Sequence, residues 1–438
     1  MTALTNGAQR GHREAPYQHL TQTSRGTPSG ELLRRYWQPV GLSGDVTPNG
    51  VPRASRVLGE NLVLYRDDRG RPGLLARKCA HRCADLSYGR VEDGGLRCIY
   101  HGWLYDVEGK CLEQPGEQKT STFKDKVRQP SYPCHEAGGA IWAYLGPGEP
   151  PLFPNYPAVV VPEAYRFTAR WLANCNWLQG NEGNIDPIHT SYLHRFDLAD
   201  PVEKARLGVF HVDIAPELSI EDTRFGLRVY TQRQVPNSDE YILRITNLVM
   251  PNACAINGYE ASLGPGGCSM FWHVPIDDEH HWRYEFTFHA KGALPKAQMA
   301  AQYASEKDAD DRPKRSEDNR YLQDRDSMPQ SYLGMGKCFP AHDLFVTESQ
   351  GAIHEQSDEH LASSDIAIAR ERRLLSEAIR AMEAGGDPRG IVRDPSENVF
   401  DDIVVVTKQL PGETDKHVFC NELAAGRMYE LVPGVGAS

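Results

Sequence analysis

Two short stretches decide the fold of the first third of this chain: Cys79-Ala80-His81-Arg82 and Cys98-Ile99-Tyr100-His101-Gly102-Trp103. Each contains a Cys followed two or three residues later by a His, and sixteen residues separate His81 from Cys98. Thiolate and imidazole groups are ligands of iron and zinc, so the four side chains are predicted to meet at one metal centre. Short alternating runs and frequent Gly and Asp from about residue 50 to 150 predict an all-β module whose loops carry these ligands.

Two kinds of centre take two Cys and two His: a structural zinc ion, or a 2Fe–2S cluster whose thiolates hold one iron and whose imidazoles hold the other. The Cys-x-His spacing is tighter than the Cys-x2–4-Cys and His-x3–5-His spacings usual for zinc. Gly102 permits close backbone approach, and Trp103 supplies a large apolar shield. These features, with a second metal motif downstream, favour the iron–sulfur cluster. Its predicted ligands are Cys79, His81, Cys98 and His101.

The second set of potential ligands lies in Asp186-Pro187-Ile188-His189 and at His194. Steps of three and five residues along a helix would bring Asp186, His189 and His194 to roughly the same side, with His194 at or past the helix end. Two imidazoles and one carboxylate can hold a mononuclear iron(II) and leave positions open for dioxygen. Taken alone, these three residues could equally well be surface residues or hydrogen-bonded core residues with no metal. Beside an electron-storing cluster it predicts an oxygenase.

The composition narrows the class of protein. The 438 residues suffice for two domains, and 48 Lys and Arg against 59 Asp and Glu give a net charge of −11. Nucleic acid and anionic membranes attract clustered positive charge, so neither is an expected partner. No apolar run approaches the roughly 20 residues that span a bilayer, and the first thirty residues lack the apolar core of a signal peptide. We therefore expect a cytoplasmic protein.

Ten cysteines are scattered along the chain, unlike the dense pattern of a small secreted protein held by disulfides. Two of them are the predicted cluster ligands. The remaining eight are interpreted as free thiols, many of them buried as small apolar side chains: Cys83, Cys111, Cys134, Cys175, Cys254, Cys268, Cys338 and Cys420.

The sequence pattern divides the chain into an N-terminal segment over 1–40, the all-β domain over 41–150 and a larger domain over 151–438. The Gly- and Pro-rich residues 146–151 mark the second boundary, because they cannot continue a strand ladder. A short helix in the first segment is expected to carry Leu32, Leu33, Tyr36 and Trp37.

Alternating apolar residues, as in 284–288, predict half-buried strands in the larger domain. The clearest helix spans 363–383, with Ser363 or Ser364 as its N-cap and Gly385 beyond its end. This domain is therefore predicted to be α+β, with an antiparallel sheet and helices on one face.

The order of these motifs resembles the α subunits, or terminal oxygenase components, of Rieske non-haem iron ring-hydroxylating oxygenases. The resemblance covers the chain from about residue 30 and is greatest for the phthalate dioxygenase-like and aromatic O-demethylase-like branch. It includes Cys175-Asn176-Trp177-Leu178-Gln179 and Glu348-Ser349-Gln350. Tyr100 stands where respiratory Rieske proteins carry an extra Cys, so their disulfide cannot form here. Cys83 departs from the Gly that the family commonly has.

The resemblance implies a Rieske β domain followed by an α+β catalytic domain with a central antiparallel sheet flanked by helices. It implies that His189 and His194 hold the mononuclear iron with Asp343, Glu348 being the alternative carboxylate. It gives Asp186 a different role, in which its side chain joins a ligand His to a cluster His of a neighbouring subunit.

The resemblance also implies partners. A separate reductase is expected to supply electrons, because the chain has neither a Gly-x-Gly-x2-Gly fingerprint nor a plant-type ferredoxin Cys run. Cluster and iron of one subunit are too far apart in the family, so a head-to-tail homotrimer or two stacked trimers is implied. Dioxygen and an aromatic molecule would be the substrates, for ring dihydroxylation or oxidative O-demethylation. The rival interpretation is a Rieske electron carrier fused to a non-catalytic binding domain.

Arg244 is the predicted substrate-binding residue. It lies in Ile242-Leu243-Arg244-Ile245-Thr246, where a charge within an apolar pattern needs a partner. A planar guanidinium binds a carboxylate through two parallel hydrogen bonds, so Arg244 is expected to anchor an aromatic acid. Arg228 and Arg233 are nearby alternatives, and an ordinary salt bridge would explain any one of the three.

Overall fold

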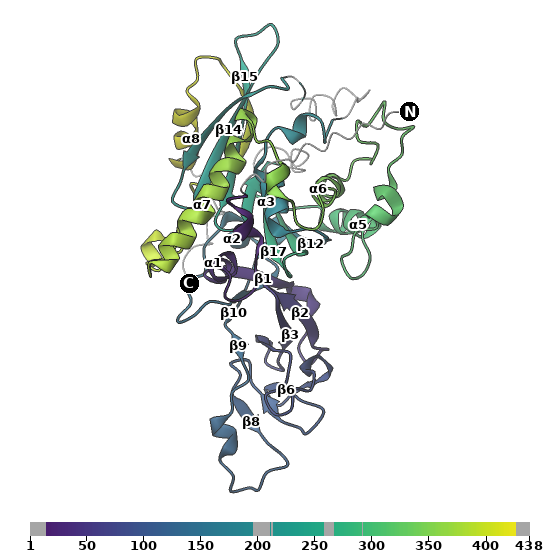
Figure 1. Ribbon diagram of the computed structural model, residues 1–438, viewed down its shortest axis with the longest axis vertical. Helices are drawn as coiled ribbons and strands as arrows, with labels where there is room; N and C mark the ends of the chain where they lie inside the picture. The colour runs from purple at the N-terminus through teal and green to yellow at the C-terminus, as the bar shows by residue number, and fades with distance from the viewer. Residues whose placement is uncertain (1–14, 196–210, 212, 258–266, 291, 426–438) are drawn as a thin grey trace, which may run out of the picture.

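A computed structural model describes residues 15–195, 211, 213–257, 267–290 and 292–425. Figure 1 shows two regions along the long axis: a narrow region of short strands below, and a broader region with a large sheet and most of the helices above. This arrangement confirms the predicted fold class of an all-β region followed by an α+β region. The first fourteen residues of the predicted N-terminal segment lie outside the described residues.

The N-terminal region consists of three antiparallel sheets, in the strand orders β1-β11-β10, β2-β3-β4-β9 and β5-β6-β7-β8. Its strands are β1 Trp37–Leu42, β2 Arg53–Val57, β3 Glu60–Arg66, β4 Pro72–Ala76, β5 Arg90–Glu92, β6 Gly95–Arg97, β7 Leu104–Tyr105, β8 Cys111–Glu113, β9 Ser131–Tyr132, β10 Cys134–Ala137 and β11 Ala140–Tyr144. The two predicted cluster stretches are the β4–β5 and β6–β7 connections.

The predicted N-terminal helix is shorter than expected. Helix α1 spans Pro28–Arg34, with Pro28 at its first turn and the Thr27 side chain accepting a hydrogen bond from the Gly30 amide. Tyr36 and Trp37 were also predicted to lie on this helix, but both lie beyond its end, and Trp37 begins β1 and pairs with Tyr144 of β11. The prediction was wrong for Trp37 because pairing with a strand a hundred residues away overrides the local helical spacing.

The C-terminal region is built on an antiparallel sheet in the order β12-β18-β17-β16-β15-β14-β13, with β19 also paired to β15. Its strands are β12 Arg166–Ala173, β13 Glu217–Asp222, β14 Gly226–Gln234, β15 Tyr241–Val249, β16 Ala253–Ile256, β17 Gly267–Pro275, β18 His281–His289 and β19 Val406–Leu410. Its helices are α2 Pro157–Val160, α3 Trp177–Ile185, α5 Lys296–Glu306, α6 Phe339–Glu348, α7 Ile366–Glu383 and α8 Lys416–Ala425. None of the helices in the described part of the chain is long and apolar enough to cross a membrane.

The helix predicted over 363–383 is α7, which begins three residues later than expected. Its N-cap residue is Asp365, so the prediction of Ser363 or Ser364 was wrong. The first three predicted residues instead form a 3-10 turn that leads into the helix. Gly385 follows the helix end with φ +83°, a left-handed conformation that Gly adopts at little cost.

The two faces of the large sheet differ in chemistry. Cross-strand partners lie on the same face, and the strand registers therefore place Arg244, His273 and Arg283 on one polar face. Helix α3 packs against this face, where Asn184 Oδ1 lies 2.7 Å from His273 Nε2.

The opposite face is apolar along β17 and β18. Trp272 and Phe286 lie there, and Trp142 of β11 packs against both, with ring centroids 5.1 and 5.3 Å apart. Cys420 of α8 joins a separate apolar cluster with Leu243 on the same face. The expectation of helices on only one face was therefore wrong: α8 packs on the opposite face, against the apolar side chains of Tyr241, Leu243 and Ile245 of β15.

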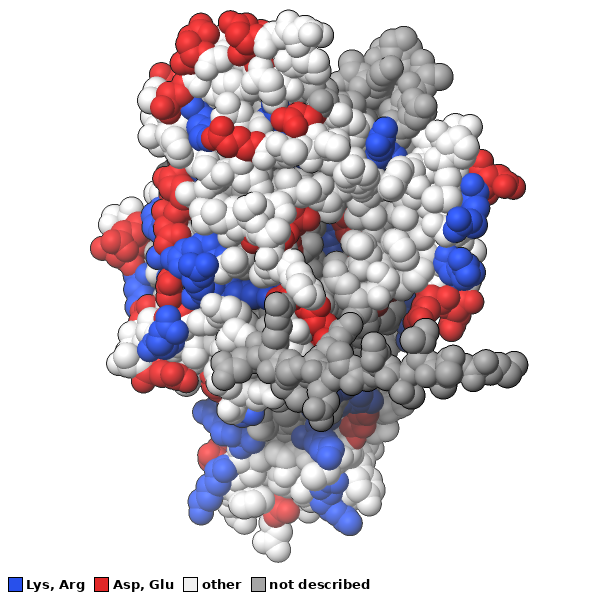
Figure 2. All heavy atoms as spheres, turned by 45° about the horizontal axis from the view of Figure 1, so that its top comes forward, with Lys and Arg blue, Asp and Glu red and all other residues white. Residues whose placement is uncertain are grey.

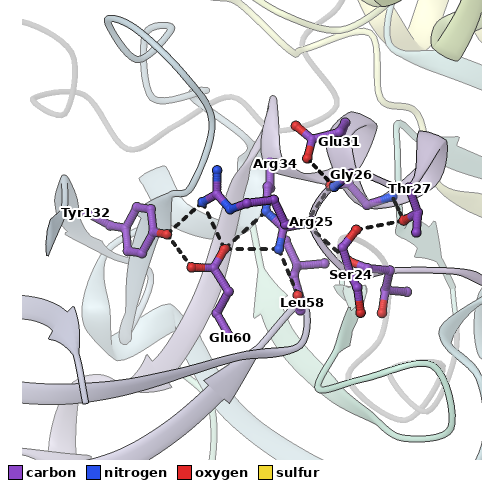
Figure 3. A network of polar contacts seen from close by, with 11 residues as sticks. Ser24, Arg25, Gly26, Thr27, Glu31, Arg34, Leu58, Glu60 and Tyr132 are labelled. Carbon is purple, nitrogen blue, oxygen red and sulfur yellow. Dashed lines mark hydrogen bonds and ion pairs between the residues drawn. The ribbon is translucent and has the colours of Figure 1, made fainter. Parts of the chain in front are cut away.

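A polar network ties the N-terminal region together near its junction with the large sheet (Figure 3). Buried Arg34 of α1 donates to Leu58 O at 2.8 Å and to Glu60 at 3.0 Å. Tyr132 of β9 donates to the other oxygen of Glu60. The Leu58 amide also donates to Pro275 O, at the end of β17. These bonds fix the orientation of the N-terminal region on the sheet.

Candidate metal centres

The two cluster loops have nearly the same backbone. The Cys79 amide donates to Ala84 O at 2.8 Å, and the Cys98 amide donates to Trp103 O at 2.9 Å. Each Cys carbonyl in turn accepts from the amide four residues later, at 2.8 and 3.0 Å. Two equivalent turns therefore present one Cys and one His each at the same end of the region.

The four predicted cluster ligands come together. Cys79 and Cys98 are buried, with 2% and 3% of their surface exposed, and the rings of His81 and His101 lie 4.6 Å apart. His81 stacks on Trp103, whereas His101 is exposed. Burial and the nearby Cys79 raise the pKa of Cys98, so two thiolates here require a compensating cation. The donor set fits a 2Fe–2S cluster with imidazoles on its outer iron.

Cys83 closes the first loop in a left-handed conformation, with φ +57°. Gly102 holds the equivalent position in the second loop, with φ +76°. A residue with a Cβ atom is strained at such an angle, whereas Gly is not. Gly would therefore be less strained than Cys83 at this position.

The iron segment is less helical than predicted. Helix α3 ends at Ile185, and Asp186 is extended, with φ −69° and ψ 121°. The residue before a proline is forced out of the helical conformation, and Pro187 follows. His189 lies in a separate 3-10 turn, His189–Ser191. The assumption of one helix was therefore wrong, although the three side chains remain close.

Three predicted ligands of the mononuclear iron converge. His189, His194 and Asp343 each offer one ligand atom within 4.8 Å of the others, and His194 Nε2 lies 3.1 Å from Asp343 Oδ1. Asp343 comes from α6, which contacts α3. Two imidazoles and a carboxylate are the donor set of a mononuclear iron(II) with open positions.

Glu348, the alternative carboxylate, points elsewhere. One of its oxygens accepts from the Asn174 amide at 2.9 Å, and the other accepts from the Tyr321 hydroxyl at 2.8 Å. It is absent from the ligand cluster found among the described residues. The geometry therefore favours Asp343 as the third ligand.

Asp186 orients His189. Its carboxylate accepts from the Ile188 and His189 amides at 2.8 and 3.1 Å, and lies 3.3 Å from His189 Nδ1. With Nδ1–H donating to Asp186, His189 offers Nε2 to a metal. Burial alone would raise the pKa of Asp186, but the hydrogen bond and the attraction to His189 have the larger effect, so the pKa is lowered overall. Asp186 is therefore ionised at neutral pH.

His342 lies behind the other imidazole. Its Nδ1 is 3.2 Å from His194 Nδ1, and its Nε2 is 3.0 Å from Gly336 O. Burial, with the neighbouring His194, lowers the pKa of His342 to about 4. The ring is therefore neutral at physiological pH.

Arg283 of β18 lies behind Asp343. Its Nη2 is 3.4 Å from Asp343 Oδ2, and the guanidinium covers the Phe271 ring. Burial alone would raise the pKa of Asp343. The hydrogen bond and charge of His194, with the charge of Arg283, have the larger effect and bring the pKa far below its ordinary value. The carboxylate is therefore fully charged and ready for a cation.

A cavity of about 230 Å³ reaches this site from the surface. Asp186, His189, Asp343 and Arg283 are among the residues that line it, and so is Leu361. Leu361 is 43% exposed, so the cavity opens where an apolar side chain meets solvent.

The three candidate arginines are placed differently. Arg244 is buried on the polar sheet face, and its charge adds to the effect of burial, which lowers the pKa of His194. Arg233 donates to Pro187 O at 3.2 Å and so supports the iron segment. Arg228 pairs in register with Asn247 on the opposite face. Arg244 and Arg233 therefore lie on the sheet face against which α3 packs, and Arg228 lies on the opposite face.

Sequence reasoning missed Arg283 and the role of His342. An arginine in the alternating run His281–His289 carries the same signal that selected Arg244, a charge among apolar residues. His342 adjoins Asp343 in sequence, but nothing in the pattern indicates that its ring meets His194, 148 residues away.

Two family models match the chain. Residues 36–130 match the Rieske [2Fe-2S] domain, and residues 143–415 match the LigXa C-terminal domain like family. The matched segments correspond to the region of the cluster loops and the region of the large sheet.

Relatives with established names match over most of the chain. The oxygenase subunit of phthalate 4,5-dioxygenase from Pseudomonas putida is 35% identical over 84% of this chain and 86% of its own length. The α subunit of phenoxybenzoate dioxygenase from Ectopseudomonas oleovorans is 34% identical over 87% and 90%. The oxygenase subunit of 5,5'-dehydrodivanillate O-demethylase from Sphingobium is 32% identical over 86% and 83%.

Solved structures share the fold at lower identity. A carbazole 1,9a-dioxygenase oxygenase in complex with ferredoxin has a TM-score of 0.55 at 19% identity, over 88% of this chain and 98% of that one. Dicamba monooxygenase has a TM-score of 0.56 at 18% identity, over 81% and 99%. The chain belongs to the Rieske non-haem iron oxygenases, as a terminal oxygenase subunit that carries a 2Fe–2S cluster and a mononuclear iron.

Proposed function

We propose that this oxygenase oxidises an aromatic carboxylate at an iron held by His189, His194 and Asp343. The observation that carries the proposal is the convergence of these three ligand atoms close to the sheet face that bears Arg244. When bound, the cluster and the iron supply the redox chemistry that activates dioxygen. The chain itself must hold the metals, orient the substrate and bring a cluster to the iron.

Buried hydroxyl groups around Arg244 support a carboxylate subsite. Thr231 and Thr407 are its cross-strand partners on either side, and Thr246 lies two residues further along β15. The hydroxyl oxygens of all three are buried without a hydrogen-bond partner among the residues that the structure describes. An unsatisfied buried hydroxyl costs about 1–3 kcal/mol, and the oxygens of a bound carboxylate would accept from these groups.

The names of the relatives agree with this substrate class. Phthalate, phenoxybenzoate and 3-chlorobenzoate appear in the names of three dioxygenase subunits, and each is an aromatic carboxylate. We propose that Arg244 holds the carboxylate of such a substrate, while the ring or an aryl methyl group faces the open iron positions.

Product analysis tests the proposal and separates its two reactions. The purified oxygenase would receive electrons from a compatible reductase and a panel of benzoates, phthalates and methoxybenzoates, each beside its uncharged methyl ester. We expect turnover of carboxylates and little turnover of the esters. A cis-diol product indicates ring dihydroxylation, whereas formaldehyde indicates O-demethylation. Preferred turnover of the uncharged esters would contradict the carboxylate anchor.

A head-to-tail homotrimer, or two stacked trimers, is the assembly we propose. Exposed apolar side chains surround the cluster loops, among them Ile99, Tyr100 and Phe123, which are 61%, 55% and 50% exposed. At the cavity that leads to the iron, Leu361 is likewise exposed. Covering both patches would bring His101 of one copy to Asp186 of the next, which would link cluster and iron through His189.

The charge distribution favours such contacts. Residues 41–150 carry 15 Lys and Arg against 14 Asp and Glu, whereas the rest of the chain carries 33 against 45. Figure 2 shows basic side chains on the narrow end and several acidic ones on the broad end of the visible face. We further propose a separate reductase as the electron donor, a cytoplasmic location, and segment limits at 1–40, 41–150 and 151–438.

A further inference from the structure

The two predicted iron imidazoles have different partners behind them. His189 is oriented by the Asp186 carboxylate, 3.3 Å from its Nδ1. His194 has a second imidazole in the equivalent place, that of His342, with the two Nδ1 atoms 3.2 Å apart. His342 is fully buried on α6, where its side chain is held by the helix that also carries Asp343.

The hydrogen positions follow from what each atom can do. The Gly336 carbonyl can only accept, so His342 Nε2, 3.0 Å away, must carry a hydrogen. A neutral imidazole has one N–H, which leaves His342 Nδ1 with a lone pair. That lone pair accepts from His194 Nδ1–H, and His194 is left with a lone pair on Nε2.

This tautomer is the one that a metal requires. His194 Nε2 is the atom that lies 3.1 Å from Asp343 Oδ1, in the ligand cluster. If the proton were on Nε2 instead, His194 would direct an N–H at the metal position and could not bind it. The Gly336 carbonyl thus selects, through two rings, which nitrogen of His194 is free.

We infer that His342 is a positioning residue that fixes the tautomer and ring orientation of His194 for iron binding. The inference rests on the proposed assignment of His194 as an iron ligand. The two ligand imidazoles then differ in their partners: His189 has the anionic Asp186, whereas His194 has the neutral His342. A carboxylate partner makes a ligand imidazole more basic, so His189 is the stronger donor of the pair.

Two substitutions separate the hydrogen bond from the volume of the ring. His342→Leu fills a similar volume with an apolar side chain and so removes the acceptor. His342→Asn places an amide oxygen close to where Nδ1 stands and so keeps an acceptor for His194. Ala341→Gly, one residue earlier on α6, is the matched control, because it weakens the helix by about 1 kcal/mol without touching His194.

The measurements are the Kd for iron(II), from competition with a chelator, and the electron paramagnetic resonance spectrum after nitric oxide is added to the enzyme with an oxidised cluster. We expect His342→Leu to weaken iron binding by about 10- to 100-fold and to change the spectrum. His342→Asn should recover most of the affinity. Ala341→Gly should lower Tm and leave the Kd unchanged, and all three variants should keep the absorption of the Rieske cluster.

Wild-type affinity and spectrum in His342→Leu would overturn the inference. So would a loss of iron in His342→Leu that His342→Asn does not recover, or an equal loss in Ala341→Gly. Failure of the ligand assignment is distinguished by His194→Ala: if that variant binds iron normally, His194 is not a ligand and the proposed function, rather than the role of His342, is wrong.

Discussion

The two metal centres of this chain are built in opposite ways. The cluster loops are local and nearly repeated: each is a turn closed by the same pair of backbone hydrogen bonds, and all four ligands lie within residues 79–101. The proposed iron ligands come from the turn segment that follows α3 and from α6, and Asp343 follows His194 by 149 residues. A centre of the first kind is formed by its own loops, whereas the second exists only when the sheet has brought distant elements together.

The largest expected effect separates the two centres. His189→Ala, His194→Ala or Asp343→Ala should each remove the mononuclear iron and reduce turnover below detection, because two ligands hold this metal poorly. Iron analysis should fall from three atoms per chain to the two of the cluster. The visible absorption of the Rieske cluster is the internal control and should not change.

Full iron and normal turnover in Asp343→Ala would show that another carboxylate completes the site, and Glu348→Ala would then be the variant to examine. Loss of the cluster in any of these variants would show that the centres are not independent. Either result would contradict the distinction between a cluster site formed by its own loops and an iron site assembled from distant elements.

The second prediction concerns the contact between the centres. Asp186→Asn should leave both metals loaded and slow the electron transfer that follows substrate and dioxygen binding, by about 10- to 100-fold. The amide keeps an acceptor for one backbone amide but loses the charge that we propose joins His189 to His101 of a neighbour. Stopped-flow reoxidation of the reduced cluster measures the step.

Asp308→Asn is a suitable control, since Asp308 also accepts from two backbone amides, those of Asp310 and Arg312, but far from the iron segment. Equal slowing in both variants would mean that loss of the turn, rather than of the bridge, is responsible. Normal turnover by a dilute monomer would contradict the proposal that the cluster of a neighbouring subunit supplies electrons to this iron.

The third prediction tests the polar sheet face. Arg244→Lys should raise KM for an aromatic acid about tenfold, because the ammonium keeps the charge but loses one of two charged hydrogen bonds. KM for the uncharged methyl ester should change little. Arg228→Lys, on the opposite face of the same sheet, should leave both values unchanged. Equal increases for acid and ester would make Arg244 structural.

The smallest effect is expected in the cluster loop. Cys83→Gly should raise the unfolding free energy by about 1 kcal/mol, because Gly relieves the left-handed strain at φ +57°. Cys83→Ala removes the thiol but keeps the Cβ atom and should give no gain. Thermal unfolding of the holoenzyme measures both variants. A gain of the same size in Cys83→Ala would assign the effect to the thiol.

Local patterns predicted the parts of this molecule that are formed locally. The cluster ligands, the all-β region and helix α7 depend on spacings within one loop or one helix, where neighbouring residues decide the conformation. Even there, the N-cap of α7 was misplaced, and Trp37 was placed on a helix, because strand pairing with Tyr144 lies outside any local window.

The sequence by itself determined the chemistry: which side chains could bind a cluster, which could hold iron, and which three arginines could bind an anion. Only the tertiary structure decided which groups meet. It brought Asp343 rather than Glu348 to His194, placed Arg244 and Arg228 on opposite faces of the sheet, and set His342 behind His194. Residues that are adjacent on a strand point to opposite faces, and rings far apart in sequence meet only through packing. No local spacing carries that information.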